Sequence, residues 1–383
     1  MEKHDICRLA RESVYFFSPG MLNLFYERNA IPNSDDPFGP ARRKRAPYFH
    51  TRVWRKKKLI MANFPSFIGG FRSGSTLLIN YLGLHPRVSA IYETKFLTDL
   101  LRIARLLMDE DGRGRRELTL LAEWVRVPAM SRETAIEFIV QRALSDITVT
   151  QQVLDGLASD GKAPYERYAL GTNHILWDAP EAMEAIDPFL SAVRAEKPPQ
   201  ELLPILASGI QTLFLRHAGR EGKYYWINKT PEILRFQPEL RQMLGHVRLV
   251  HLIRDGRDVV HSSAKLNWWS VEMGTKWWKL FIEDVRAQAS QHPADYMELR
   301  YEEFVADHIG TLKRVLDFLE IDGDPVEIVA AQERQAPGSA STEEAERRIG
   351  QWRSGMSAGD KTIFKTIAND LLISLGYANN ADW

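Results

Sequence analysis

The chain has very little cysteine and no long apolar run. Its single cysteine, Cys7, excludes an intrachain disulfide and is typical of a reducing compartment. No apolar stretch approaches the roughly 18–20 residues of a transmembrane helix. The N-terminal segment also lacks the uninterrupted apolar core of a signal peptide. The sequence therefore predicts a cytoplasmic protein with no transmembrane segment.

The chain also lacks net charge. Fifty basic residues balance fifty acidic ones over 383 positions, so the overall charge predicts no nucleic-acid partner and no anionic membrane. Two basic runs, at 42–45 and 55–58, are interpreted as a solvated approach to the first strand. Any anion-binding site must therefore be local.

A glycine-rich stretch at 67–78 has the order of a strand end, a turn and a helix start. That order is typical of a phosphate-binding loop. Gly69 and Gly74 have the spacing of a Walker A loop, but Ser75 stands where that motif has its phosphate-contacting lysine. With Arg72 inside the loop, the sequence predicts a loop that binds an anionic group by a similar geometry. The chemistry carried out on that group should differ from that of a nucleoside triphosphatase.

Strand and helix patterns alternate after this loop. Apolar runs predict further strands at 88–92, 224–227, 247–253 and 296–299. Helical patterns separate them, and a helix should follow the loop directly. This alternation predicts an α/β fold with a P-loop-type parallel sheet flanked by helices.

The predicted organisation is an N-terminal extension, 1–58, followed by one α/β domain, 59–383. Within that domain, helical stripes predict a large helical insertion at about 97–220 that covers the active-site edge of the sheet. A polar stretch with several glycines, at about 333–360, predicts a mobile lid. A terminal helix at 363–375 closes the domain.

Polar residues stand where the predicted strands end. The first strand leads into Arg72, and Glu93, Lys229 and Arg254 stand at or just past the ends of the next three candidates. Tyr301 follows the last candidate. Because ligands of open parallel sheets bind beyond the carboxyl ends of the strands, this convergence predicts a site.

These residues resemble the sulfotransferases that use 3′-phosphoadenosine 5′-phosphosulfate. Residues 72–76 match that family's 5′-phosphosulfate signature. Residues 254–262 match its 3′-phosphate signature, an arginine followed eight positions later by serine. The blocks at 228–231 and 300–304 resemble two further parts of the family. The resemblance covers about residues 64–355 discontinuously, and it implies a P-loop fold and sulfuryl transfer without a metal.

The resemblance implies a role for each matched residue. The family's donor, and its product 3′-phosphoadenosine 5′-phosphate, would be bound by Arg72, Ser73, Gly74, Ser75, Thr76, Arg254, Ser262, Tyr301 and Arg348. Physically, the amides of the loop and a helix N-terminus suit the 5′-phosphosulfate, and Arg254 is a fork suited to a phosphate. The catalytic residues would be Glu93 as base, Lys229 as donor to the leaving phosphate, and Arg72.

The base has competitors. Glu93 stands twenty-one positions after Arg72, which is the spacing of the tyrosylprotein branch of the family. The cytosolic small-molecule branch uses a histidine, so His85, His174 and His261 compete with Glu93. We expect His85 to end a helix and His261 to pack behind the loop.

Ion pairs offer structural alternatives for two of these residues. Glu93 could pair with Lys95 or with Arg72, and Arg254 could pair with Asp258 in the absence of a ligand.

The acceptor is left open. Trp268–Trp269 and Trp277–Trp278 could line an aromatic pocket, or Trp269, Met273 and Trp277 could form the buried face of a helix, which we favour. The resemblance implies a small-molecule, lipid or carbohydrate acceptor with a hydroxyl or an amine. A missing membrane anchor and the lack of paired cysteines argue against a protein-tyrosine acceptor.

The sequence disfavours two other classes of function. A P-loop kinase or nucleotide hydrolase is disfavoured by Ser75 and by the lack of a clear Walker B aspartate. A non-catalytic nucleotide-binding protein is disfavoured by the presence of both Glu93 and Lys229.

Overall fold

The structure, a computed structural model, describes residues 64–108, 112–124, 127–159, 177, 179–266, 269–335 and 342–383. The predicted N-terminal extension at 1–58 lies outside the described residues. The same holds for His174 and Trp268.

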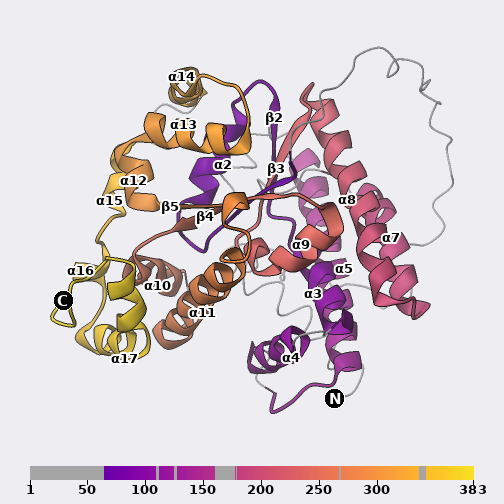
Figure 1. The fold of residues 1–383 in the computed structure, drawn as a ribbon, viewed down its shortest axis with the longest axis horizontal. Helices are drawn as coiled ribbons and strands as arrows, with labels where there is room; N and C mark the ends of the chain where they lie inside the picture. Colours follow the sequence, from indigo (N-terminus) through magenta and orange to yellow (C-terminus); the bar gives the residue numbers. More distant parts are fainter. Residues whose placement is uncertain are drawn as a thin grey trace.

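Five parallel strands form one sheet in the order β2-β3-β1-β4-β5 (Figure 1). They are β1 Ser66–Gly69, β2 Val88–Tyr92, β3 Tyr225–Lys229, β4 Arg248–Ile253 and β5 Tyr296–Arg300. All but β5 are buried along most of their length. That burial explains why they read as continuous apolar runs. The predicted α/β fold with a parallel sheet is confirmed.

The strand bounds agree closely with the predictions, and β3 is the instructive exception. It was expected to end at Ile227, but it continues to Lys229 because Asn228 and Lys229 pair with Ile91 and Tyr92 of β2. Because strands were predicted from apolar runs, polar residues at the end of a strand make the predicted strand too short.

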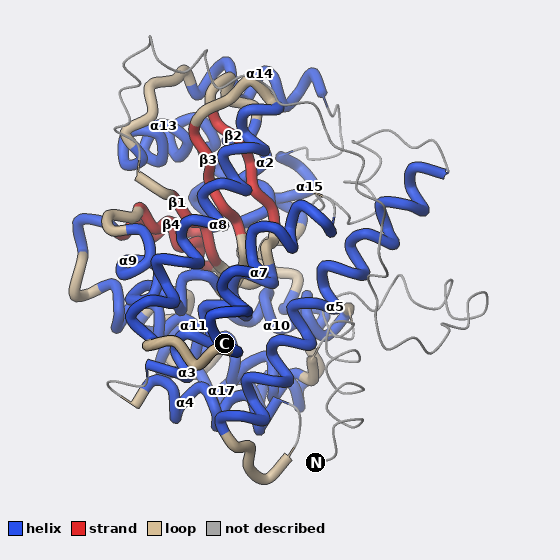
Figure 2. Tube along the Cα trace, turned by 90° about the vertical axis from the view of Figure 1, so that its right-hand side faces the viewer, coloured by secondary structure: helices blue, strands red, loops and turns tan. Residues whose placement is uncertain are grey.

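Helices cover both faces of the sheet (Figures 1 and 2). One face packs against α2 Ser75–Gly83, α12 Tyr301–Ala306, α13 His308–Leu319 and α14 Pro325–Gln335. Ile68 and Val250 point to this face, whereas their neighbours Phe67 and Leu249 point to the other. This alternation follows the two-residue period of a strand.

The opposite face carries η2 Ile233–Phe236, α9 Gln237–Leu244 and α11 Val271–Ala289, with the helices predicted between 97 and 220 beside them. Those helices are α3 Lys95–Met108, α4 Arg113–Trp124, α5 Arg132–Ser159, α7 Ala179–Arg194 and α8 Pro199–Arg220. They lie along the side of the sheet that ends in β2 and β3, and α8 packs against both strands. Within the described residues, no helix is long and apolar enough to cross a membrane.

The C-terminal elements lie beside the β5 side of the sheet (Figure 1). They are α15 Thr342–Arg347, α16 Trp352–Gly355 and α17 Ala358–Ser374; helix α10 Gly256–Lys265 lies nearby, and η3 Pro293–Asp295 precedes β5. The predicted terminal helix begins earlier than expected, at Ala358. Ser357 and Asp360 form a capping box there, which satisfies the first amides of the helix.

Candidate active site

The turn between β1 and α2 has the shape of an anion cradle. Gly70, Arg72 and Gly74 all have positive φ angles, of 136°, 48° and 85°. At Gly74 a Cβ atom would lie 2.4 Å from the ring of Tyr301, so no side chain fits. The Ser75 hydroxyl donates to the Gly70 carbonyl at 3.1 Å and closes the turn. Because Gly74 supplies no side-chain cap, the first amides of α2 are left for another acceptor.

Arg254 lies directly against this loop. Its Nη1 donates to the carbonyl of Arg72 at 3.2 Å, its Nη2 donates to the carbonyl of Arg348, and its guanidinium lies 4.6 Å from the ring centre of Tyr301. The buried Nε of Arg254 and the buried hydroxyl of Ser73 have no hydrogen-bond partner among the described residues. A ligand bound at this place would satisfy both donors.

Three guanidinium groups gather at the same place. Burial, followed by repulsion from Arg254 and Arg348, lowers the pKa of Arg72. The Nε of Arg72 donates to the hydroxyl of Ser262 at 3.2 Å. The structure therefore brings the two predicted signatures, 72–76 and 254–262, into direct contact. A cluster of cations in a partly desolvated site favours an anionic ligand.

Asp258 forms with Arg254, at 3.7 Å, the ion pair that the sequence offered as an alternative to a ligand. Its oxygens also accept hydrogen bonds from the amides of Gly350 and Trp352 at 2.7 Å and 3.0 Å. Burial raises the pKa of Asp258, against the effect of those bonds. Asp258 thus fastens the chain after α15 to helix α10.

The described part of the predicted lid is held at two further points. The Tyr301 hydroxyl donates to the carbonyl of Ala345 at 3.0 Å, and Arg254 donates to that of Arg348. Residues 336–341 of that segment lie outside the described residues, and mobility of the lid stays a prediction.

Glu93 and Lys229 form an ion pair at the ends of two adjacent strands. The Lys229 Nζ donates to Glu93 Oε1 at 2.6 Å. The lysine side chain is 1% exposed and the glutamate side chain 24%. The sequence had offered Lys95 or Arg72 as partners of Glu93. The pairing with Lys229 was missed because the sequence does not reveal that β2 lies beside β3.

Two of the three histidines that compete with Glu93, His85 and His261, lie among the described residues. His85 follows the C-terminal end of α2 as expected, and its ring contacts the carbonyl of Asp322 and the amide of Arg87 at 2.9 Å and 3.1 Å. His261 packs against Gly355 of α16. Burial lowers the pKa of both imidazoles.

The tryptophans in and just before α11 differ from the expected pattern. Trp269 and Trp277 stack at 6.4 Å, but they and Met273 are only half-buried. The buried face lies one residue further on, at Gly274, Trp278 and other residues. Its position is set by α10, because Trp278 closes onto Gly256, where a Cβ atom would lie 2.5 Å away. Packing thus explains Trp278, whereas Trp269 and Trp277 remain partly accessible.

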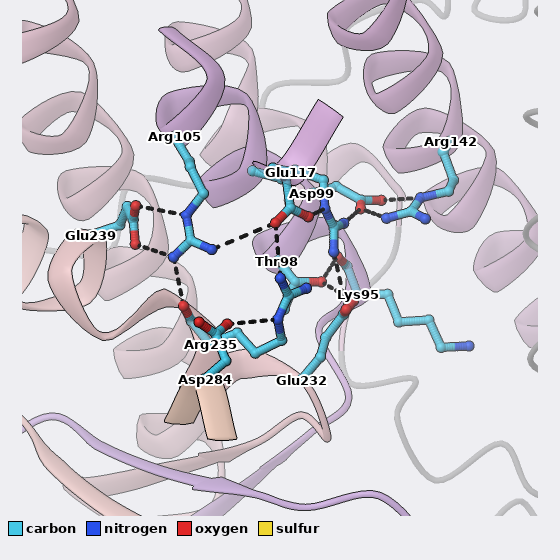
Figure 3. Close-up of polar contacts among 11 residues, drawn as sticks. Lys95, Thr98, Asp99, Arg105, Glu117, Arg142, Glu232, Arg235, Glu239 and Asp284 are labelled. Atoms are coloured by element: carbon cyan, nitrogen blue, oxygen red, sulfur yellow. Dashed lines mark hydrogen bonds and ion pairs between the residues drawn. The ribbon is translucent and has the colours of Figure 1, made fainter. Parts of the chain in front are cut away.

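A buried network of charges beneath the site was not predicted (Figure 3). Arg102 of α3 pairs with Asp99, Glu117 and Glu232 at 2.9 Å, 2.5 Å and 3.0 Å. Figure 3 shows further members from α3, α5, η2, α9 and α11, namely Arg105, Arg142, Arg235, Glu239 and Asp284. Arg105 and Glu239 of this network are 134 residues apart in the sequence, so no local motif reveals such a pair.

The fold and site define a parallel α/β protein whose sheet carries, at its carboxyl edge, a glycine-rich loop, clustered arginines and a carboxylate–lysine pair. The chain belongs to the sulfotransferase family, whose family model matches residues 65–325, and it is a sulfotransferase. No curated protein sequence matches the chain.

Several solved structures are similar at low identity. The sulfotransferase domain of the Synechococcus PCC 7002 olefin synthase is 16% identical, with 80% of this chain and 94% of that one covered and a TM-score of 0.41. The sulfotransferase domain from the curacin biosynthetic pathway is 15% identical, with coverages of 81% and 97% and a TM-score of 0.41. Retinol dehydratase, crystallised with retinol and PAP, is 16% identical, with 80% of this chain and 81% of that one covered and a TM-score of 0.32. The family assignment rests on the match over residues 65–325.

Proposed function

We propose that the chain transfers the sulfuryl group of 3′-phosphoadenosine 5′-phosphosulfate to a hydroxyl or an amine of a small-molecule, lipid or carbohydrate acceptor. The observation that carries this proposal is the Glu93–Lys229 ion pair on the sheet edge that also bears the loop and Arg254. Membership of the sulfotransferase family supports the reaction class.

The residues present fit this donor. The loop amides of Ser73, Gly74, Ser75 and Thr76, together with Arg72, would hold the 5′-phosphosulfate. Arg254, Ser262, Tyr301 and Arg348 would hold the 3′-phosphate end. Guanidinium has five N–H donors, and the bonds of Arg254 to the carbonyls of Arg72 and Arg348 use only two of them. The unpaired Ser73 hydroxyl and Arg254 Nε are donors that an anionic ligand would satisfy.

Lys229 suits the place where negative charge develops. When bound, the donor supplies a sulfuryl group carried on a phosphate. The ammonium of Lys229 has three N–H donors, of which one goes to Glu93, so two remain for phosphate oxygens. Because Lys229 is almost fully buried, its charge acts in a low dielectric, where it stabilises an anion more strongly than in water.

Glu93 suits the role of base. Its carboxylate accepts a hydrogen bond from Lys229, and 24% of its side chain is exposed at the carboxyl edge of the sheet. There it would take the acceptor's proton. The ion pair keeps base and cation at one fixed spacing, as in-line transfer requires.

The acceptor would bind beside β2. Helix α3 begins at Lys95, two residues after Glu93, and the helices at 95–220 lie along this side of the sheet. We assign acceptor binding to them, closure over the nucleotide to residues 342–360, and a cytoplasmic location to the protein.

Calorimetric titration tests the donor. We expect 3′-phosphoadenosine 5′-phosphate to bind without added metal and more tightly than ATP with magnesium. Arg254→Ala should weaken that binding. Preference for ATP would contradict the proposal. A panel of phenols, alcohols and amines, with release of the bisphosphate from the donor as readout, then identifies the acceptor class.

A further inference from the structure

We infer that Thr94, Asn228 and Thr230 are positioning residues that hold the Glu93–Lys229 pair in register. The inference rests on the proposed function of that pair. Each of the three is a chain neighbour of one member of the pair, because Thr94 follows Glu93 and the other two flank Lys229.

The three side chains are bonded to one another across the gap between β2 and β3. Asn228 Nδ2 donates to Thr94 Oγ1 at 2.9 Å, and Thr230 Oγ1 donates to Asn228 Oδ1 at 3.1 Å. Thr230 Oγ1 also accepts from the backbone amide of Thr94 at 3.0 Å. All three residues are buried, with at most 2% of any of them exposed.

The bonds close into a ring with every hydroxyl proton used. The two threonine hydroxyls lie 3.3 Å apart, and either could be the donor from geometry alone. Since the proton of Thr230 goes to Asn228, the proton between the hydroxyls belongs to Thr94. Thr94 then donates one bond and accepts one, and Thr230 donates one and accepts two, which a hydroxyl can do.

This ring of hydrogen bonds holds residues that lie beyond the end of the β2–β3 backbone ladder. The β2–β3 register ends with Tyr92 opposite Lys229, so the residues that follow have left the sheet on the β2 side. The ring replaces the missing ladder bonds by giving the amide of Thr94 an acceptor. It therefore fixes the backbone on both sides of the ion pair.

The segment after Lys229 is also tied to the donor loop. The Thr230 amide donates to the carbonyl of Ile68 at 3.2 Å, and the Gly70 amide donates to that of Pro231 at 3.0 Å. Thr230 thus joins the end of β2, the end of β3 and strand β1, and its neighbour Pro231 holds the loop after β1.

Stability alone does not require polar residues at these positions. Apolar side chains of the same shape would fill the space, and exchanging a bonded set of buried polar groups for such side chains is often close to neutral. A closed polar ring instead allows only one arrangement of the backbone. We therefore infer that the role of the ring is to fix the geometry of the Glu93–Lys229 ion pair.

The test compares Thr230→Val, Thr230→Ser and Thr275→Val. Valine keeps the shape of threonine and removes the hydroxyl, whereas serine keeps the hydroxyl. Thr275 is fully buried, and its hydroxyl donates only within its own helix, to the carbonyl of Val271 at 2.7 Å. Thr275→Val is therefore the matched control for the same chemical change in the core.

We expect Thr230→Val to lower kcat at least about tenfold while KM for the donor and the Kd of the bisphosphate stay within about twofold, because misplacement by about 1 Å can cost up to about a hundredfold in rate. A crystal structure of this variant should show the Nζ–Oε1 distance beyond hydrogen-bond reach, about 3.5 Å. Thr230→Ser and Thr275→Val should keep both the pair and the rate.

The inference is overturned if Thr230→Val retains the ion pair and the wild-type kcat, or if Thr230→Ser loses as much as Thr230→Val. The variant Lys229→Ala distinguishes a failure of the positioning role from a failure of the proposed function. If that variant keeps full turnover, the role of the pair is wrong. If it is inactive while Thr230→Val is fully active, only the positioning role is wrong.

Discussion

Arg72 Nε donates a hydrogen bond to Ser262 Oγ at 3.2 Å, across 190 positions of the chain. Arg72 belongs to the loop after β1, and Ser262 to the second turn of α10. The bond joins the two halves of the proposed donor site. A substitution on α10 that removes it should therefore alter the position of Arg72 in the loop.

Replacing Ser262 by alanine should therefore weaken binding of 3′-phosphoadenosine 5′-phosphate by about tenfold. The expected loss is that of one hydrogen bond to a charged group, about 1.5 kcal/mol. Isothermal calorimetry measures it. The matched control is Ser263→Ala, since the Ser263 hydroxyl donates only to the carbonyl of Val259 in the same helix. Equal effects of the two substitutions would contradict the assignment.

The ion pair should be needed for turnover and dispensable for nucleotide binding. We expect Lys229→Ala and Glu93→Ala each to reduce turnover at least about a thousandfold, because they remove the charge and the base of the transition state. Binding of the bisphosphate, followed by calorimetry, should survive. Near-full activity of Glu93→Ala would show that another residue is the base.

Asp258→Asn should loosen the segment that follows α15. The amides of Gly350 and Trp352 donate to different oxygens of Asp258, and asparagine replaces one of these oxygens by an NH2 donor, so one of the two bonds is lost. Hydrogen exchange should become faster at these amides. Asp307→Asn is the control, because Asp307 accepts from Gly310 at the start of α13. Faster exchange at Gly350 in both variants would indicate general destabilisation.

The buried charge network predicts an acid-sensitive stability. Burial alone would raise the pKa of Glu117, but Arg235, Arg102 and Arg105 outweigh it and lower the pKa to about 2, from 4.5. A carboxyl group whose pKa is lower in the folded state stabilises it above the unfolded pKa. This contribution is lost as the pH falls from 4.5 towards 2.

Glu117→Gln should therefore flatten the fall in the free energy of unfolding over that range. It should also cost about 3 kcal/mol at pH 7, since it leaves buried arginines without their counter-charge. Urea unfolding as a function of pH measures both effects. Glu184→Gln, in a surface pair with Arg216, should cost less than about 1 kcal/mol. A wild-type slope in Glu117→Gln would contradict the prediction.

The fold was predictable because buried parallel strands and their polar ends leave local signals. The strand 88–92 was predicted with its observed bounds, and each predicted site residue at a strand end lies at the carboxyl edge of one sheet. The loop and Arg254 could likewise be matched as short contiguous motifs.

The order of the strands was not predictable from the sequence. The side-chain partners that depend on this order could therefore not be predicted either. Glu93 meets Lys229 because β2 lies beside β3, a tertiary fact with no local signal. The same holds for Thr94 and Thr230, which are common residue types without periodicity. Glu117 was missed because its arginines come from α3 and η2.

The position of β1 in the sheet has a consequence for biosynthesis. This strand leaves the ribosome before the other four, yet it lies in the middle of the sheet and pairs with β3 and β4. Its β3 edge therefore stays open until residues up to Lys229 have been made, and its β4 edge until residues up to Ile253 have been made. During that interval the nascent chain presents an unpaired apolar strand, the kind of surface that chaperones bind and that promotes aggregation. The central strand is thus the first to be made and among the last to be protected.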